Sequence, residues 1–71
     1  MEIKARVPGV VEEVLVKEGD SVQVKDVLLK LEAMKMVQPV PCPVAGTVEE
    51  VLVEKGDRVK SGQVMVVVEE A

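Results

Sequence analysis

The chain has 71 residues, with 13 acidic and 9 basic side chains that give a formal net charge of −4 at pH 7. It contains no His, Phe, Tyr or Trp, so it lacks the commonest general base and metal ligand and the rings that stack on nucleic acid bases. The acidic balance also disfavours a nucleic acid partner. A chain this short is expected to form a single domain, residues 1–71, without a deep catalytic cleft or a metal site of its own.

Valine supplies 19 of the residues, so β-branched side chains must build most of the core. A branched Cβ packs well on a pleated surface, which favours strands over helices. The single cysteine, Cys42, cannot form an internal disulfide, and this suits a reducing compartment. No signal-peptide pattern and no apolar run of membrane-spanning length is present. We therefore expect an all-β, cytoplasmic protein with no direct membrane insertion.

The first strands are bounded by glycine turns. Ile3–Val7 alternates apolar and polar residues, the pattern of a strand with one buried face, and Pro8-Gly9 interrupts it. Val10–Val16 follows, and its apolar positions would also fit one face of a helix. The Pro-Gly start, the stop at Gly19-Asp20 and the density of valine favour a strand, after which comes a short polar passage.

A hairpin is predicted in the middle of the chain. Val27–Glu32 reads as a strand that ends at Met34-Lys35, and Val37–Val40 reads as the strand that returns. Pro39 must then occupy a position whose N–H the ladder does not need. The following Pro41-Cys42-Pro43 is predicted to be a stiff, extended connector.

The second half of the chain repeats the first. Residues 7–34 align without a gap with residues 44–71 at an offset of 37, and 13 of the 28 pairs are identical. Two copies are too few for a solenoid, so they should close on each other as two interlocked small sheets with pseudo-two-fold symmetry, a flattened barrel or sandwich. The acidic pairs Glu12-Glu13 and Glu49-Glu50 lie at equivalent repeat positions, which indicates solvated strand faces rather than a catalytic dyad.

The pentapeptide Glu32-Ala33-Met34-Lys35-Met36 lies at the joint of the repeat. The symmetry puts its hairpin turn at the end of the domain opposite the termini, where a carrier would present its cargo. A lone lysine between two methionines would ordinarily be a solvated side chain beside two gap-filling core residues. At this joint we interpret it as the attachment point of a covalently bound, swinging cofactor.

The repeats and the pentapeptide closely resemble the biotinyl domains of biotin-dependent carboxylases and decarboxylases, from about residue 5 to residue 69. The shared features are the Pro8-Gly9 turn, both Gly-Asp turns, Ala33-Met34-Lys35-Met36 and the Pro41–Gly46 connector. The resemblance implies an eight-stranded flattened barrel-sandwich of two four-stranded sheets. It also implies a non-catalytic biotin carboxyl carrier in which biotin protein ligase biotinylates Lys35, with Met34 and Met36 as recognition neighbours and Glu32 and Ala33 completing the motif.

By the same resemblance, the carrier would serve a biotin carboxylase and a carboxyltransferase or decarboxylase subunit. Acetyl-CoA carboxylase carriers of bacteria have a protruding thumb insertion in the first half, which would break the constant offset of 37. The chain is therefore more similar to the thumbless carriers of pyruvate and propionyl-CoA carboxylases, transcarboxylase and sodium-pumping decarboxylases.

Two other functions stay open. Lipoyl domains share the fold and modify a lysine on the matching turn, but that turn typically reads Asp-Lys-Ala, without a methionine on each side. An unmodified barrel-sandwich domain that acts as a spacer is the third interpretation.

The chain also departs from the family pattern in three places. Lys25 stands where repeat two has Gly62, so strain is expected in the first-half turn, and Val37 and Pro39 replace polar or acidic residues beside the motif.

Overall fold

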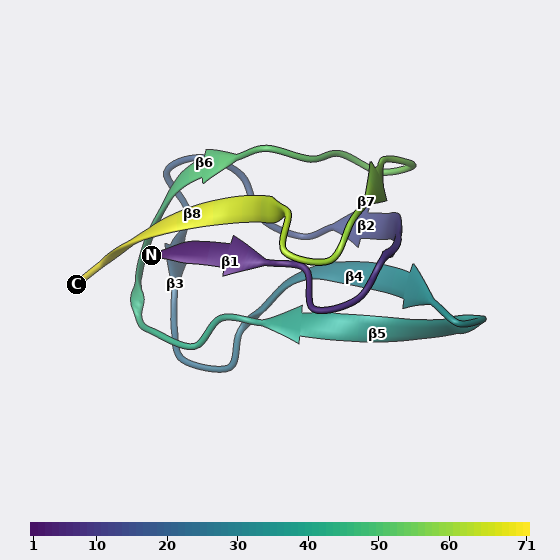
Figure 1. Cartoon of the computed structure of the whole chain (residues 1–71). Helices are drawn as coiled ribbons and strands as arrows, with labels where there is room; N and C mark the ends of the chain where they lie inside the picture. Colours follow the sequence, from purple (N-terminus) through teal and green to yellow (C-terminus); the bar gives the residue numbers. More distant parts are fainter.

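The computed structural model describes residues 1–71 and contains eight strands and no helix (Figure 1). The strands are β1 (Glu2–Lys4), β2 (Gly9–Val14), β3 (Ser21–Val22), β4 (Val27–Ala33), β5 (Met36–Pro41), β6 (Gly46–Val51), β7 (Arg58–Val59) and β8 (Val64–Glu70). They form two four-stranded antiparallel sheets in the orders β1-β8-β6-β3 and β5-β4-β2-β7. The predicted fold class, a flattened barrel-sandwich of two four-stranded sheets, is confirmed. No helix long and apolar enough to cross a membrane is present.

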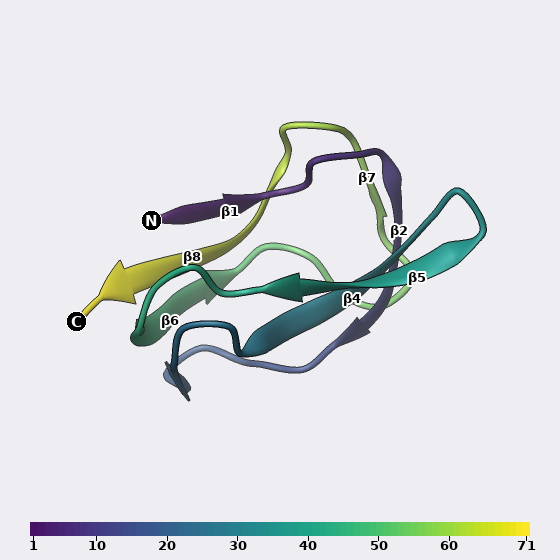
Figure 2. The same ribbon diagram turned by 90° about the horizontal axis from the view of Figure 1, so that it is seen from below.

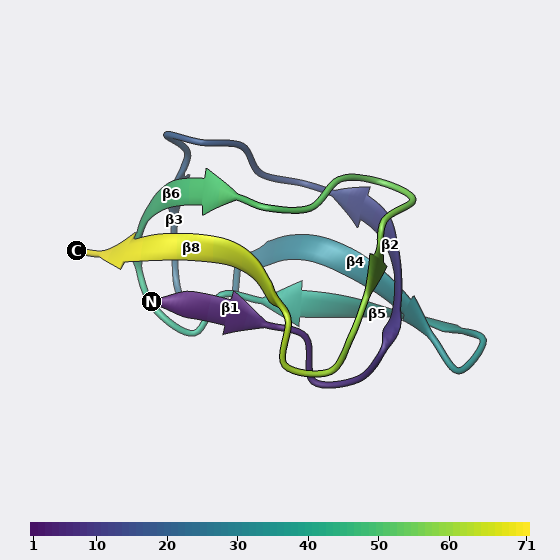
Figure 3. The same ribbon diagram turned by 45° about the horizontal axis from the view of Figure 1, so that its top comes forward.

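The two sheets have the same internal plan. Adding 37 to the bounds of β2, β3 and β4 gives the bounds of β6, β7 and β8. When β1 is also matched with β5, the strand order of one sheet corresponds to that of the other. Even the irregularities match, because the register shifts between Val11 and Glu13 in one sheet and between Val48 and Glu50 in the other. Figure 3 shows β8 lying between β1 and β6 in the first of these sheets.

Hydrogen bonds that cross between the two halves tie the sheets together. The Gly19 N–H donates to the carbonyl of Val48 at 2.9 Å, and the Val48 N–H donates to the carbonyl of Asp20 at 2.8 Å. The equivalent pair of bonds joins Gly56 and Asp57 to Val11 at 2.8 Å each. Each Gly-Asp turn therefore satisfies backbone groups on the central strand of the other half.

The core is aliphatic throughout, and no polar or charged side chain is buried in it. Equivalent positions of the two halves meet there, and the largest fully buried side chains are Leu28, Leu29, Met65, Val11, Val48, Val66, Val68 and Cys42. Cys42 is buried, and its thiol donates a hydrogen bond to the carbonyl of Val44 at 3.0 Å. The molecule measures 34 × 18 × 18 Å; both termini lie toward one end, and the β4–β5 turn lies at the other (Figure 1).

The strand bounds differ from the sequence predictions in informative ways. β1 ends at Lys4 and β2 ends at Val14, two to three residues earlier than predicted. In β2, the register shift after Val11 breaks the alternation of buried and exposed residues, which explains why its apolar pattern also fitted a helix. The polar passage after Gly19-Asp20 contains β3, with Val22 buried in the core. Pro39 lies on the edge strand β5, where a residue can lack an N–H without removing a ladder bond.

The two halves also offer a matched test of backbone strain. Lys25 has a φ of 76°, and its counterpart Gly62 has a φ of 87°. An L side chain in the left-handed region costs about 1–2 kcal/mol, whereas glycine adopts it freely at an entropic cost of about 0.5–1 kcal/mol on folding. We expect Lys25→Gly to raise the free energy of unfolding by about 0.5–1 kcal/mol and Gly62→Lys to lower it by about 1 kcal/mol. Urea denaturation of both variants measures the difference, and a stability loss in Lys25→Gly would contradict the prediction.

Candidate functional site

The β4–β5 hairpin turns through only two residues, Met34 and Lys35, with Ala33 and Met36 as the last cross-strand pair. Their φ values are 53° and 65°, so both central residues are left-handed, as in a type I′ turn. Such turns favour Asn-Gly because side chains with a Cβ are strained there. The hairpin therefore holds a methionine and a lysine in a backbone conformation that neither prefers, and six cross-strand residue pairs behind the turn maintain it.

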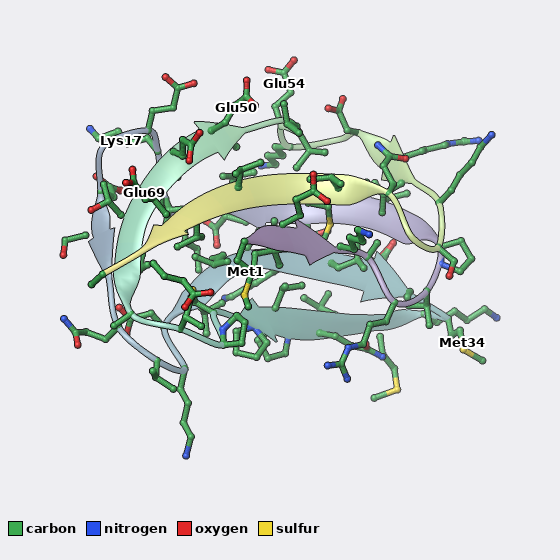
Figure 4. The ribbon with its side chains drawn as sticks, turned by 60° about the vertical axis from the view of Figure 1, so that its left-hand side comes forward. Met1, Lys17, Met34, Glu50, Glu54 and Glu69 are labelled. Atoms are coloured by element: carbon green, nitrogen blue, oxygen red, sulfur yellow. The ribbon has the colours of Figure 1, made fainter.

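The side chains of the turn lie in solvent. Met34 is 87% exposed and Met36 is 63% exposed, so these methionines are not gap-filling core residues. Figure 4 shows Met34 at the end of the β4–β5 hairpin, on the outside of the molecule. Lys35 is also exposed, and it takes part in neither of the two ion pairs of the structure, Lys4–Glu2 and Lys30–Glu13. The primary amine is thus free to meet another molecule.

The base of the hairpin is packed tightly against β2. Ala33 is buried, whereas Glu32 is exposed, in keeping with the alternation of β4. A Cβ at Gly9 would lie 2.4 Å from the carbonyl oxygen of Glu32 and 3.3 Å from the Cβ of Ala33. Gly9, predicted only to interrupt a strand, lets β2 approach the base of the hairpin. Gly46, the identical residue of the second repeat, approaches the carbonyl of Glu69 in the same way. The presence of glycine at this position in both repeats was therefore the sequence signal for a close backbone approach.

Neither a metal-binding cluster nor a groove surrounds Lys35. The structure has no group of three or more Cys, Asp or Glu side chains placed to hold a metal ion. Glu12, Glu13, Glu49 and Glu50 are all exposed on their strands, as expected for solvated faces. A groove of about 810 Å³ beside β1 and β5 is not lined by Lys35. The hairpin thus presents the Lys35 amine on a narrow tip, with no ion-pair partner beside it.

The hairpin also projects from the body of the molecule. In Figure 2, β4 and β5 run side by side to the turn, which extends past β2 and β7. β5 is an edge strand of its sheet, and β4 lies between β5 and β2. An enzyme that acts on Lys35 can therefore surround the tip on most sides without displacing any other element.

Comparison with solved structures gives close matches over nearly the whole chain. The urea carboxylase of Kluyveromyces lactis matches with a TM-score of 0.91 and 26% identity, over 97% of this chain and 6% of that one. A single-chain, multi-domain long-chain acyl-CoA carboxylase matches with a TM-score of 0.93 and 32% identity, over 100% and 7% of the two chains. The lipoyl domain of the 2-oxoglutarate dehydrogenase complex from Azotobacter vinelandii matches with a TM-score of 0.85 and 26% identity, over 99% and 96%.

The chain thus spans under a tenth of the length of the two carboxylases but almost all of the lipoyl domain. No curated protein sequence matched it. The model of the biotin/lipoyl family, described as "Biotin-requiring enzyme", matches residues 1–68. That match covers nearly the entire domain, including the exposed turn, and the chain belongs to the biotin/lipoyl attachment family.

Proposed function

We propose that the chain is a biotin carboxyl carrier domain in which Lys35 is the covalent attachment site. The observation that carries the proposal is the two-residue turn, where Lys35 is exposed between the exposed side chains of Met34 and Met36. A ligase needs an accessible amine on a tip narrow enough to enter its active site, and a two-residue hairpin provides one. Membership of the biotin/lipoyl family supports the same assignment.

The strain in the turn supports a functional reason for the lysine. With a φ of 65°, Lys35 occupies a position where glycine would cost less, and Met34 at 53° is in the same situation. Residues held in sparsely populated backbone conformations persist where the surrounding structure maintains them, and they cluster at functional sites. A turn selected only for stability would use Asn-Gly here.

The attachment chemistry requires little of the domain itself. The Lys35 Nζ, after losing its proton, attacks the acyl carbon of a biotinyl-adenylate in the ligase, so that an amide bond forms and AMP leaves. The amide carries no charge, and the formal net charge changes from −4 to −5. Met34 and Met36 would contact the ligase, while Glu32 and Ala33 complete the recognised segment. The buried Ala33 anchors the tip to the sheet.

Bound biotin supplies a ureido nitrogen that carries a carboxyl group between active sites. The role of the domain is then to bring Lys35 to a biotin carboxylase and to a carboxyltransferase or decarboxylase in turn. A tethered arm raises the effective concentration at each site, so the domain itself needs no catalytic group. The similarity to segments of two much longer carboxylases supports a carrier that works beside such enzymes, and we propose that it does so in the cytoplasm.

A lipoyl carrier is the second candidate, because the chain also matches a lipoyl domain over 96% of that domain's length. We favour biotin for two reasons. Lys35 has a methionine on each side, which is not typical of lipoyl turns, and the identity to the acyl-CoA carboxylase is 32%, against 26% to the lipoyl domain. The two cofactors differ in mass, and separate ligases attach them, so one experiment distinguishes them.

The direct test is intact-mass spectrometry of the apo domain after incubation with biotin protein ligase, ATP and biotin. We expect one biotinyl adduct on the wild type and none on Lys35→Arg, which keeps the charge but has no primary amine. The other lysines serve as internal controls, since a second adduct would show unspecific acylation. No adduct on a wild type that is folded by circular dichroism would reject the biotin assignment, and an adduct with lipoate ligase and lipoate would establish the second candidate instead.

The strain argument makes a separate prediction about stability. Replacing Lys35 by glycine should abolish modification yet raise the free energy of unfolding by about 0.5–1 kcal/mol, because glycine tolerates a positive φ. Lys35→Ala is the matched control, since it removes the amine but keeps a Cβ, and its stability should stay close to that of the wild type. Thermal or urea unfolding of the three proteins measures the effect. Equal stability of the glycine and alanine variants would contradict a strained turn.

A further inference from the structure

The two sheets end in equivalent edge strands, β1 and β5, that carry different surfaces. At the offset of 37, the second-half residues Pro39, Pro41 and Pro43 stand where the first half has Glu2, Lys4 and Arg6. All six residues are exposed. Three pairs of positions with the same fold requirements thus carry charges on one edge and prolines on the other.

The prolines face the open side of the edge. Between Pro41 and Pro43, the Cys42 N–H donates to the carbonyl of Asp26 at 2.7 Å, and the Cys42 carbonyl accepts from the Lys25 N–H at 2.7 Å. Ala5 makes the equivalent bonds between Lys4 and Arg6. Backbone groups of neighbouring residues in a strand point in opposite directions, so the backbones of these flanking residues face away from the sheet. The β5 edge therefore presents no N–H donor at three alternate positions.

Both sets of residues prevent another strand from adding to the sheet, but they leave different surfaces behind. Charged side chains and prolines are alternative ways to protect an exposed edge. Residues 36–48 form the longest stretch of the chain without a charged side chain, in a protein that is 31% charged. Within it, Met36 and Val37 are 63% and 49% exposed. The edge of β5 is thus both closed to strand addition and apolar.

This apolar edge begins at the lysine turn. β5 starts one residue after Lys35, and it is the only strand of the hairpin with a free edge, because β4 pairs with β2. In Figure 4, Glu50 and Glu54 project from the side of the molecule opposite β5, whereas the exposed Glu32 pairs with Val37 across the hairpin. An enzyme that closes over Lys35 meets the uncharged edge of β5 next.

From this arrangement, and on the basis of the proposed function, we propose that the β5 edge, defined by Met36, Val37, Pro39, Pro41 and Pro43, is the surface on which the biotin ligase docks to modify Lys35. The complementary surface on the ligase is uncharged and lined by apolar or aromatic side chains, which bind exposed prolines well. A partner strand is disfavoured because the prolines cannot donate to it, and a second copy of the chain would meet the same obstacle.

The test compares biotinylation kinetics of two matched double variants. Pro39→Glu/Pro41→Lys gives the β5 edge the charges of β1 and leaves the net charge unchanged. Glu2→Lys/Lys4→Glu exchanges the charges of β1 and also leaves the net charge unchanged. In the presence of ATP and biotin, we expect the KM of the ligase for the β5 variant to be about tenfold or more above that for the wild type, because charges would be buried at an apolar interface. The kcat should stay near the wild-type value, since Lys35 and its turn are intact, and the β1 variant should match the wild type.

A third variant separates charge from backbone effects. Pro39→Ala/Pro41→Ala restores the N–H groups but keeps the edge uncharged, so its KM should rise by only about two- to threefold. Circular dichroism at the assay temperature verifies that each variant is folded, and the single variant Pro39→Glu replaces the double one if it is not. Unchanged KM in the charged β5 variant, or an equal rise in the β1 variant, would overturn the docking proposal. Failure of the wild type to accept biotin would instead reject the proposed function on which it rests.

Discussion

The hydrogen bonds between each Gly-Asp turn and the central strand of the opposite half are the constraint on which the rest of the fold depends. Gly19 and Asp20 bond to Val48 of β6, and Gly56 and Asp57 bond to Val11 of β2. Through these bonds, β3 completes the sheet that contains β6 and β8, and β7 completes the sheet that contains β2 and β4. Neither half can close its own sheet, so the two must fold together, and a domain of this size gains most of its buried surface from that closure.

The interlocking of the two halves also determines where Lys35 lies. Once the halves interlock, the chain passes from the first to the second through the β4–β5 hairpin, which follows the edge of its sheet to the far end of the molecule (Figure 2). The hairpin is anchored by buried Ala33 and by the close approach of Gly9 to Glu32. This anchoring lets two residues with positive φ persist at the tip. Rigidity behind the turn and exposure at the turn are what a carrier needs for repeated recognition by different enzymes.

The internal repeat made the two-sheet architecture predictable, because equal sequences at a constant offset imply equivalent strands. It could not reveal β3 and β7, since each has two residues and only one of them, Val22 or Val59, is buried. Nor could turn chemistry predict a type I′ turn at Met34-Lys35, which contains neither Asn nor Gly. The strain at Lys25 was foreseeable because Gly62 stands at the equivalent position. The exposure of Met34 and Met36 followed from the family resemblance, which made them neighbours that a ligase recognises, and not from their apolar character, which alone would indicate core.

A pseudo-symmetric fold provides its own control for interpreting surface residues. Equivalent positions satisfy the same backbone pairing and the same packing, so a difference between them cannot be required by the fold. The clearest difference lies beside the joint of the halves, where the prolines of β5 stand in place of the charges of β1, and it adjoins the strained Met34-Lys35 turn. Both lie on one continuous edge, and neither is explained by stability, since charges protect the β1 edge equally well. The surface of this domain that interacts with other proteins is therefore best sought where the two halves diverge.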